Sequence, residues 1–220
     1  MTTETTNRFR RRRMEQFLAL VDPVIAAKGE AHILDVGGTT GYWRALEPLW
    51  RGRNLRFTIV NKGIENSDDG VFALRDGDAR AMPEYADSQF DIVHSNSVIE
   101  HVGHWREMKA MAEEVRRLAP AYFLQTPNIW FPVEAHFSLP FIHWLPEQTR
   151  AAILLARKGK YLPASAGIEG ATELVQRVNL LSLAQMRALF PDASIERERV
   201  FGLTKSWIAV RRSTAERAAA

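Results

Sequence analysis

The sequence contains no cysteine among its 220 residues. This absence excludes disulfide bonds, thiolate metal ligands and cysteine nucleophiles, and it suits a reducing compartment. No apolar run approaches the roughly 18 residues that a membrane-spanning helix needs. The basic N-terminal segment MTTETTNRFRRRRMEQF also lacks the apolar stretch of a secretory signal. From these absences we expect a cytoplasmic protein without a membrane span.

The excess of positive charge is small, at +3, but it is unevenly placed. Arg8 and the run from Arg10 to Arg13 form a basic block near the N-terminus. A solvated arm at residues 1–13 explains this block. Contact with phosphate, an acidic substrate or an anionic membrane surface is the alternative.

Hydrophobic periodicity predicts a chain of alternating helices and strands. Apolar residues recur at helical spacing within residues 14–28 and 105–118, and a further helix is expected from Gly41 to about Leu49. Buried strands are expected at residues 32–36, 55–60, 90–95 and 121–126. This alternation indicates an α/β fold, with a parallel sheet covered by helices on both faces.

The composition changes after Asn128. The stretch IWFPVEAHFSLPFIHWLP is rich in aromatic residues, histidine and proline, and a helix at residues 147–157 and a Gly/Ala/Ser loop at 164–171 follow it. We expect residues 129–179 to form an insertion after the sheet's fifth strand. A helix from Ser182 to about Phe190 and an antiparallel pair at 194–201 and 205–212 then close the domain of residues 14–212, leaving residues 213–220 as a tail.

Glycines concentrate in ILDVGGTTGYW, residues 33–43, where a strand passes into a helix. Glycine costs conformational entropy there, so a close-approaching ligand is the expected reason. Dinucleotides and S-adenosylmethionine both bind at such turns. Asp35 would repel a pyrophosphate, whereas it suits the ammonium group of S-adenosylmethionine.

At these residues the sequence resembles the class I S-adenosylmethionine-dependent methyltransferases, in particular the small-molecule branch often labelled type 11. LDVGGTTG resembles their first motif, GDARAMP (77–83) their adenine loop, and FDIVHSNSVIEHV (90–102) their fourth strand with the helix after it. The resemblance implies a Rossmann-like, doubly wound, mostly parallel sheet of seven strands with an antiparallel last strand. It also implies S-adenosyl-L-methionine as cofactor.

The resemblance assigns the cofactor residues one by one. Thr39 replaces a glycine of the usual first motif, and Asn61 replaces the acid that would hold both ribose hydroxyls. An amide can still accept one hydrogen bond and donate another. The expected contacts are Asp35, Gly37, Gly38, Thr39 and Gly41 around the methionine portion, Asn61 at the ribose, Asp78 and Ala79 at the adenine edge, and Ser95 below the sulfonium.

Methyl transfer by in-line displacement mainly needs an aligned acceptor, and it needs a base only if the acceptor carries a proton to remove. The candidate bases are His101, Glu134, His136 and His143. His101 resembles a family position that helps to shape the site, and His136 and His143 are equally explained as packed rings. The nearby aromatic residues are explained as core, lid or acceptor pocket. His101 and His104 lack a third convergent ligand, so we expect no metal site.

More than one function class remains open. A small-molecule acceptor, such as a natural product, a sugar or a lipid-linked metabolite, is the favoured prediction. The alternatives are an RNA methyltransferase that uses the basic arm, and a cofactor-binding protein without catalysis. The tetrapeptide SNSV stands where amino-methylating DNA enzymes carry N/D-P-P-Y/F. The acceptor atom and the oligomeric state are not determined by the sequence.

Overall fold

The computed structural model describes residues 8–134, 136–137, 139–157, 159–163 and 165–213. The first part of the expected basic arm and nearly all of the expected C-terminal tail therefore lie outside the described residues. Within the described part of the chain, no helix is long and apolar enough to cross a membrane.

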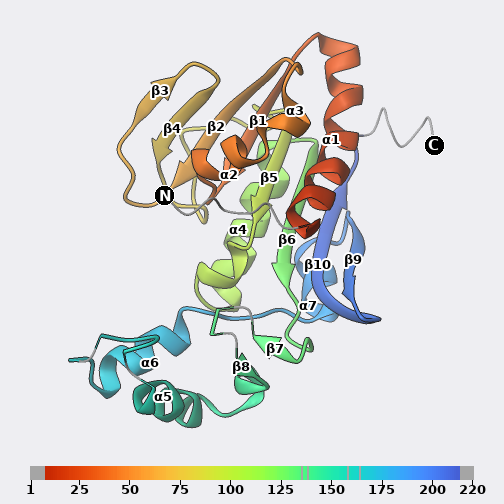
Figure 1. Cartoon of the computed structure of the whole chain (residues 1–220). Coiled ribbons are helices and arrows are strands. Elements are labelled where there is room, and N and C mark those ends of the chain that lie inside the picture. Colours follow the sequence, from red (N-terminus) through yellow and green to blue (C-terminus); the bar gives the residue numbers. More distant parts are fainter. Residues whose placement is uncertain (1–7, 135, 138, 158, 164, 214–220) are drawn as a thin grey trace.

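The centre of the molecule is a mixed sheet in the order β3-β4-β2-β1-β5-β6-β10-β9 (Figure 1). Its strands are β3 (Ser67–Asp69), β4 (Phe72–Asp76), β2 (Leu55–Asn61), β1 (Ala31–Val36), β5 (Ile92–Asn96), β6 (Ala121–Pro127), β10 (Leu203–Arg211) and β9 (Ser194–Val200). The strands from β4 to β6 pair in parallel, whereas β10 runs antiparallel to β6. The predicted doubly wound fold is therefore confirmed.

The sheet has eight strands, and the expected number was seven. The additional strand is β3, which pairs antiparallel with β4 at one edge, and β4 itself was not among the strands expected from the hydrophobic pattern. Its residues, Ser-Asp-Asp, are all exposed. The strand therefore carries no hydrophobic pattern from which it could be predicted.

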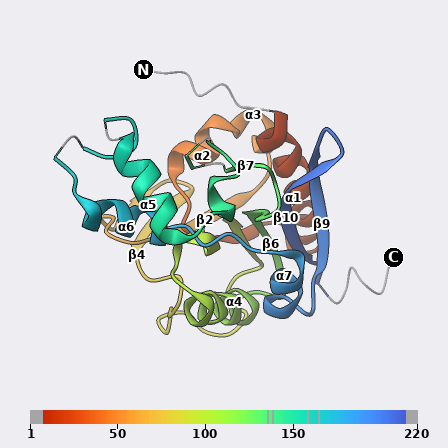
Figure 2. The ribbon, with the colours of Figure 1, turned by 90° about the horizontal axis from the view of Figure 1, so that it is seen from below.

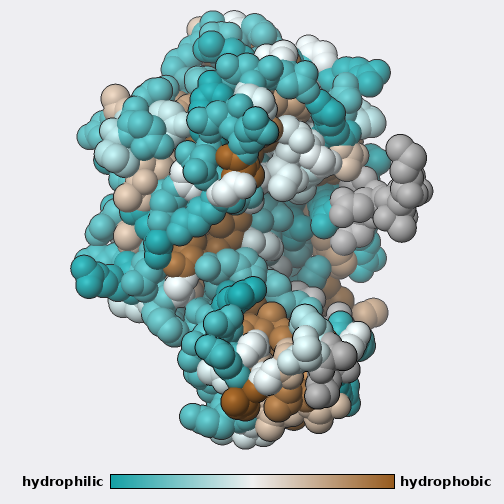
Figure 3. Space-filling model, turned by 90° about the vertical axis from the view of Figure 1, so that its left-hand side faces the viewer, coloured by the Kyte–Doolittle hydropathy of each residue, from teal (hydrophilic) through white to brown (hydrophobic). Residues whose placement is uncertain are grey.

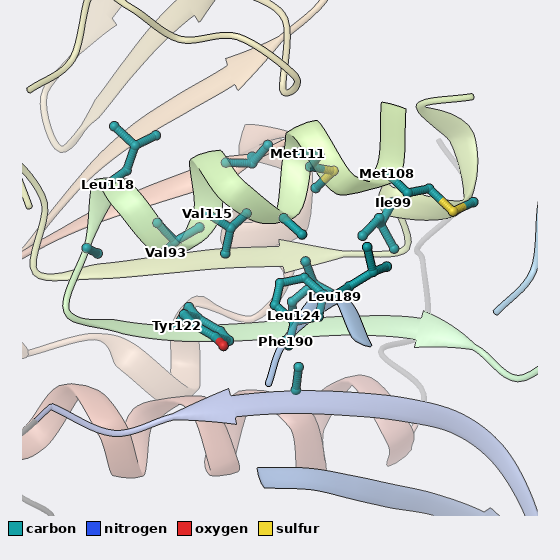
Figure 4. Packing of buried hydrophobic residues seen from close by; sticks show 14 of the residues in the cluster. Val93, Ile99, Met108, Met111, Val115, Leu118, Tyr122, Leu124, Leu189 and Phe190 are labelled. Carbon is teal, nitrogen blue, oxygen red and sulfur yellow. The ribbon is translucent and has the colours of Figure 1, made fainter. Parts of the chain in front are cut away.

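Helices cover both faces of the sheet (Figure 2). On one face lie α1 (Arg8–Lys28), α2 (Thr40–Ala45) and α3 (Glu47–Trp50), and on the other lie α4 (Trp105–Leu118) and α7 (Leu183–Leu189). Met111 and Val115 of α4 pack with Val93 and Leu124 of the sheet (Figure 4). Neighbouring residues of a strand point to opposite faces, so Ile33 joins the α1 side and Leu34 the α4 side.

Helix α1 begins at Arg8, earlier than the expected start at Met14. The arginine block therefore lies on a helix within the described residues. Arg13 is buried, and its guanidinium is 3.2 Å from the carboxylate of Glu198 on β9. No local pattern reveals this pair, because its partners are 185 residues apart in the sequence.

Residues 129–179, which we call the lid, lie below the carboxyl ends of the parallel strands in Figure 1. They contain β7 (Val133–Glu134), β8 (Leu139–Pro140), the 3-10 turn η2 (Ile142–Trp144), α5 (Glu147–Ala156) and α6 (Ile168–Gln176). The helix expected near residue 147 is confirmed. Part of the expected 164–171 loop instead belongs to α6, because Ala171 and Val175 are buried in a core of the lid's own.

Candidate active site

The strand order places a crevice at the carboxyl ends of β1 and β5. From β1 the chain builds the sheet outward through β2 and β4, and it then returns to continue on the other side with β5. In open α/β sheets, ligands bind where the strand order reverses in this way. The glycine loop after β1 lies at this position.

Two cavities flank Gly37, and a third lies beneath the lid. The β2-side cavity, of about 190 Å³, is lined by Gly37, Val60, Asn61, Lys62, Gly77, Asp78, Ala79, Arg80, Val98, His101 and Val102. The α2-side cavity, of about 430 Å³, is lined by Arg10, Asp35, Gly37, Gly38, Thr39, Gly41, Tyr42, His94 and Asn96. The lid cavity, of about 380 Å³, is lined by His101, His136, Phe137, Lys160, Tyr161, Leu174, Arg177 and Val178.

Glycine is required at positions 37 and 38 by the protein's own side chains. Gly37 has φ +76°, and a Cβ there would lie 2.5 Å from both methyl groups of Val98. A Cβ on Gly38 would lie 1.6 Å from Oδ2 of Asp35. Gly41 differs, since the nearest atom to its Cβ would be 3.8 Å away. The expected reason, a close-approaching ligand, is therefore not needed to explain the first two glycines.

Asp35 is bonded inside the protein at both carboxylate oxygens. Its Oδ1 is 2.7 Å from Nδ1 of His94, and its Oδ2 accepts a hydrogen bond of 2.6 Å from Nε1 of Trp43. Asp35 and His94 are register partners on β1 and β5, which brings the two side chains together. The residue borders the α2-side cavity, but both of its carboxylate oxygens already accept hydrogen bonds from these donors.

The α2-side cavity is also lined by four residues that the sequence analysis did not assign to the cofactor: Arg10, Tyr42, His94 and Asn96. Burial raises the pKa of Tyr42 well above its usual range. The hydroxyl of Tyr42 and Oδ1 of Asn96 are buried and have no hydrogen-bond partner among the described residues. The only feature of the local sequence that could have pointed to these four residues is the histidine at position 94, inside the otherwise apolar strand FDIVHS.

Asn61, the expected ribose residue, lines the β2-side cavity and also braces the glycine loop. Its Nδ2 donates to the carbonyl oxygens of Gly37, at 3.4 Å, and Gly38, at 3.2 Å. Its Oδ1 accepts a bond from the amide of Lys62. The Asn61 side chain thus already has hydrogen-bond partners in the loop at both of its polar atoms. Its contact with the ribose of the cofactor stays a prediction.

The expected adenine residues also border the β2-side cavity. Asp78 accepts hydrogen bonds from Arg80 and is 3.0 Å from Nζ of Lys62. The bond from Arg80, with that from Lys62, holds the pKa of Asp78 well below its usual range. Ser95, expected below the sulfonium, lies outside all of these linings, and its hydroxyl donates to the carbonyl of Val36 at 3.0 Å.

Two of the expected histidines meet in the lining of the lid cavity. Nε2 of His101, which follows β5 in the 3-10 turn η1 (Ile99–His101), is 3.0 Å from Nε2 of His136. Nδ1 of His101 is 2.9 Å from the carbonyl oxygen of Arg177. His101 also borders the β2-side cavity, so it separates the two spaces.

The remaining candidates lie elsewhere. His143 and His104 line a different cavity, together with Arg150 and Asn179. The side chain of Glu134 is outside the described part of the chain. His101 and His136 are therefore the pair of candidate bases that the structure brings together.

The aromatic residues of the lid divide into buried and exposed groups. Phe137 is buried in the lid core and borders the lid cavity, with its ring 5.9 Å from that of Tyr161. Trp130, Phe141 and Trp144 are 66%, 50% and 43% exposed. Apolar surface is visible on the lid, at the bottom of Figure 3. The lid therefore presents aromatic side chains both to its cavity and to the outside.

A doubly wound sheet with a glycine loop at its switch point, in a sequence with these motifs, defines a class I S-adenosylmethionine-dependent methyltransferase. More particularly, the chain belongs to the methyltransferase domain family, whose model matches residues 6–186. Membership implies S-adenosylmethionine as the methyl donor. No curated protein matches the chain in sequence.

Solved structures share the fold at low sequence identity. A putative zinc-dependent alcohol dehydrogenase from Rhodobacter sphaeroides is 12% identical, with a TM-score of 0.51 over 92% of this chain and 98% of that one. A putative methyltransferase from an antibiotic biosynthesis pathway of Anabaena variabilis is 18% identical, with a TM-score of 0.47 over 83% of this chain. This chain covers 64% of the Anabaena protein. At 12% identity the likeness to the Rhodobacter protein concerns the fold alone.

Proposed function

We propose that the enzyme transfers the methyl group of S-adenosylmethionine to a small-molecule acceptor held in the lid cavity. The observation that carries this proposal is the position of His101, which borders both the β2-side cavity and the lid cavity. One side chain thus separates the space assigned to the cofactor from an adjoining space of about 380 Å³. That volume is in the range of small-molecule pockets.

The cavities around Gly37 fit the donor. The α2-side cavity offers an unpartnered amide oxygen on Asn96, which suits an ammonium group, and Arg10 and the hydroxyl of Tyr42, which suit a carboxylate. These groups match the two ends of an amino acid. We therefore assign the ammonium contact to Asn96. Asp35 instead holds the loop, and His94 is the hydrogen-bond partner of Asp35. The β2-side cavity takes the adenosine, beside Asn61, Asp78 and Ala79.

The donor brings an activated methyl group, so the protein's task is to align the acceptor and to accept its proton. Alignment alone can contribute about 7 to 11 kcal/mol to lowering the barrier. A carbonyl only accepts hydrogen bonds, so the contact with Arg177 places a proton on Nδ1 of His101. The two Nε2 atoms, 3.0 Å apart, then share one proton in the neutral pair. Such a pair can take up a proton from an acceptor in the lid cavity.

Substitution of His136 tests the acceptor side of this proposal. His136→Ala is expected to lower turnover by about a hundredfold or more where proton removal limits the rate, and to leave cofactor affinity nearly unchanged. Turnover is measured as S-adenosylhomocysteine formed with a panel of small acceptors, and affinity by calorimetry. His143→Ala, which removes an imidazole from a different cavity, serves as the matched control.

Two outcomes contradict the proposal. If His136→Ala loses cofactor binding and thermal stability together, without a selective loss of turnover, the histidine is structural. If calorimetry on the wild-type protein shows binding of NAD and none of S-adenosylmethionine or S-adenosylhomocysteine, the assignment of the cavities around Gly37 is wrong.

The structure gives less support to an RNA acceptor. Arg13 is buried against Glu198, and Arg10 borders the α2-side cavity. Of the arginine block, Arg8, Arg11 and Arg12 are left exposed. Phosphate contacts dominate the affinity of proteins for nucleic acids, and they need many exposed cations.

A further inference from the structure

A group of potential metal ligands lies where η1 meets the lid. A carboxylate oxygen of Glu100 and imidazole nitrogens of His101 and His136 all lie within 4.8 Å of one another. Ligands held about 2.1 Å from one ion are themselves separated by roughly 3.0 to 3.4 Å. The two Nε2 atoms, 3.0 Å apart, already have that separation.

The hydrogen bonds of His101 orient the ring as a ligand. Its Nδ1–H donates to the carbonyl of Arg177, which leaves the lone pair of Nε2 directed toward His136. Metal-binding histidines commonly donate their other ring N–H to a carbonyl or carboxylate in this way, and that bond fixes the tautomer. The end of the lid makes a second contact with η1 besides that of Arg177. The backbone amide of Asn179 donates to the carbonyl oxygen of Glu100, and this bond holds the end of the lid against η1.

Glu100 supplies an independent observation. Its side chain is fully buried, and its Oε2 accepts a bond of 2.9 Å from the hydroxyl of Thr126. Its other oxygen, Oε1, has no hydrogen-bond partner among the described residues. A buried carboxylate oxygen without a partner is costly, and coordination of a cation is one of the few ways to satisfy it. The proton shared by the two Nε2 atoms of the histidine pair does not provide a hydrogen bond to Oε1 of Glu100.

We infer that Glu100, His101 and His136 bind a divalent first-row transition-metal ion, which takes the place of the proton that the two Nε2 atoms share in the metal-free protein. Two imidazole nitrogens and one carboxylate oxygen suit Mn²⁺, Fe²⁺, Co²⁺ or Zn²⁺ better than Mg²⁺ or Ca²⁺, which favour oxygen ligands. Three protein ligands leave further coordination positions open. His101 and His136 border the lid cavity, so an oxygen of a molecule in that cavity is the expected additional ligand.

Metal titration of the whole chain tests the inference directly. The protein is stripped with a chelator and titrated with Co²⁺, whose visible d–d bands report coordination, while calorimetry gives stoichiometry and affinity. We expect one ion for each chain. Glu100→Gln and His136→Ala should each weaken binding by at least about a hundredfold, since even outer ligands contribute about 10- to 100-fold.

His104→Asn is the control for removal of an imidazole. His104 lies three residues from His101 but borders a different cavity, and asparagine is a favourable residue at the start of α4. This variant should bind Co²⁺ like the wild type. Because Glu100 is buried, each variant is also checked for S-adenosylhomocysteine binding and for its melting temperature without metal. His136 is exposed, so its variant remains informative if Glu100→Gln does not fold.

The inference is overturned if the wild type binds none of Co²⁺, Mn²⁺ and Zn²⁺, or if folded His136→Ala binds them as tightly as the wild type. It is also overturned if His104→Asn loses as much affinity as His136→Ala. Cofactor binding is measured separately from metal binding. A protein that binds S-adenosylhomocysteine but no metal therefore refutes the metal site and leaves the proposed methyl transfer in place. A protein that binds metal but no S-adenosylhomocysteine supports the metal site and contradicts the proposed methyl transfer.

Discussion

The cofactor end of the sheet and the lid are built in different ways. At the glycine loop, Asp35 and His94 face each other because they are register partners on adjacent strands, and both are almost completely buried. The lid instead packs around a small core of its own, which includes Phe137, Leu154 and Val175, and it exposes large aromatic side chains such as Trp130. Backbone pairing therefore fixes the first region, and side-chain packing fixes the second.

This difference separates the two halves of the proposed reaction. In the proposed reaction the donor is held by positions that the sheet determines, so we expect few substitutions to be tolerated there. In the same proposal the acceptor is covered by the lid, which contacts the turn after β5 through the bond between His101 and the carbonyl of Arg177. We therefore expect variants of the two regions to separate cofactor binding from turnover.

The largest effect is expected from Gly37→Val. The left-handed backbone at φ +76° costs a branched residue about 1 to 2 kcal/mol, and the overlap with Val98 adds about 1 to 3. Unfolding free energy should fall by about 2 to 5 kcal/mol, and binding of S-adenosylhomocysteine should be lost. Denaturant unfolding and calorimetry measure these quantities. Gly170→Ala in α6, where the nearest atom to the added Cβ would be 3.7 Å away, should keep both; near-normal binding by Gly37→Val would contradict the account of the loop.

In the lid, Leu154→Ala should have a local effect. Leu154 is fully buried, and truncating such a leucine costs about 2 to 5 kcal/mol. Hydrogen exchange should show faster exchange in α5 and α6, with lower turnover and unchanged cofactor affinity. The exposed Gln148→Ala on the same helix is the control. A matching loss of cofactor affinity in Leu154→Ala would show that the two regions are not independent.

Asp35→Asn should have a smaller effect, and it separates a structural role from contact with the cofactor. The amide retains one acceptor but turns a donor toward Trp43 or His94, which costs about 1 to 3 kcal/mol. We expect lower stability, measured by denaturant unfolding, with only a modest change in cofactor affinity. The exposed Asp69→Asn, which weakens a surface ion pair with Arg44, should cost less than about 1 kcal/mol. A selective loss of affinity at full stability would return the ammonium contact to Asp35.

The smallest effect is expected from replacing Arg11 and Arg12 together by alanine. Both are exposed on α1, so stability should change by less than about 0.5 kcal/mol for each. Binding of RNA should be weak before and after the change, as measured by fluorescence anisotropy over a range of salt concentrations. A tight, salt-sensitive RNA complex that these substitutions abolish would instead support the nucleic-acid alternative.

Much of the fold was predictable because the central strands are continuously apolar and the helices between them are periodic. The glycine loop was predictable for the same reason, since a turn between a buried strand and a helix is a local pattern. Strand β3 was not predictable, because its exposed Ser-Asp-Asp carries no periodicity. The early start of α1 was missed because Arg13 is stabilised by Glu198, a residue from the other end of the chain.

The sequence by itself determined most of the order of helices and strands, the class of enzyme and the place of the glycine loop, because these follow from patterns within short stretches. Only the tertiary structure decided which side chains meet. Strand register placed Asp35 against His94, and the return of the lid placed His136 beside His101 and next to the buried Glu100. His143 was also a candidate by sequence, but it lines another cavity. Contacts between distant residues depend on the packing of whole elements, and that packing has no local signature in the sequence.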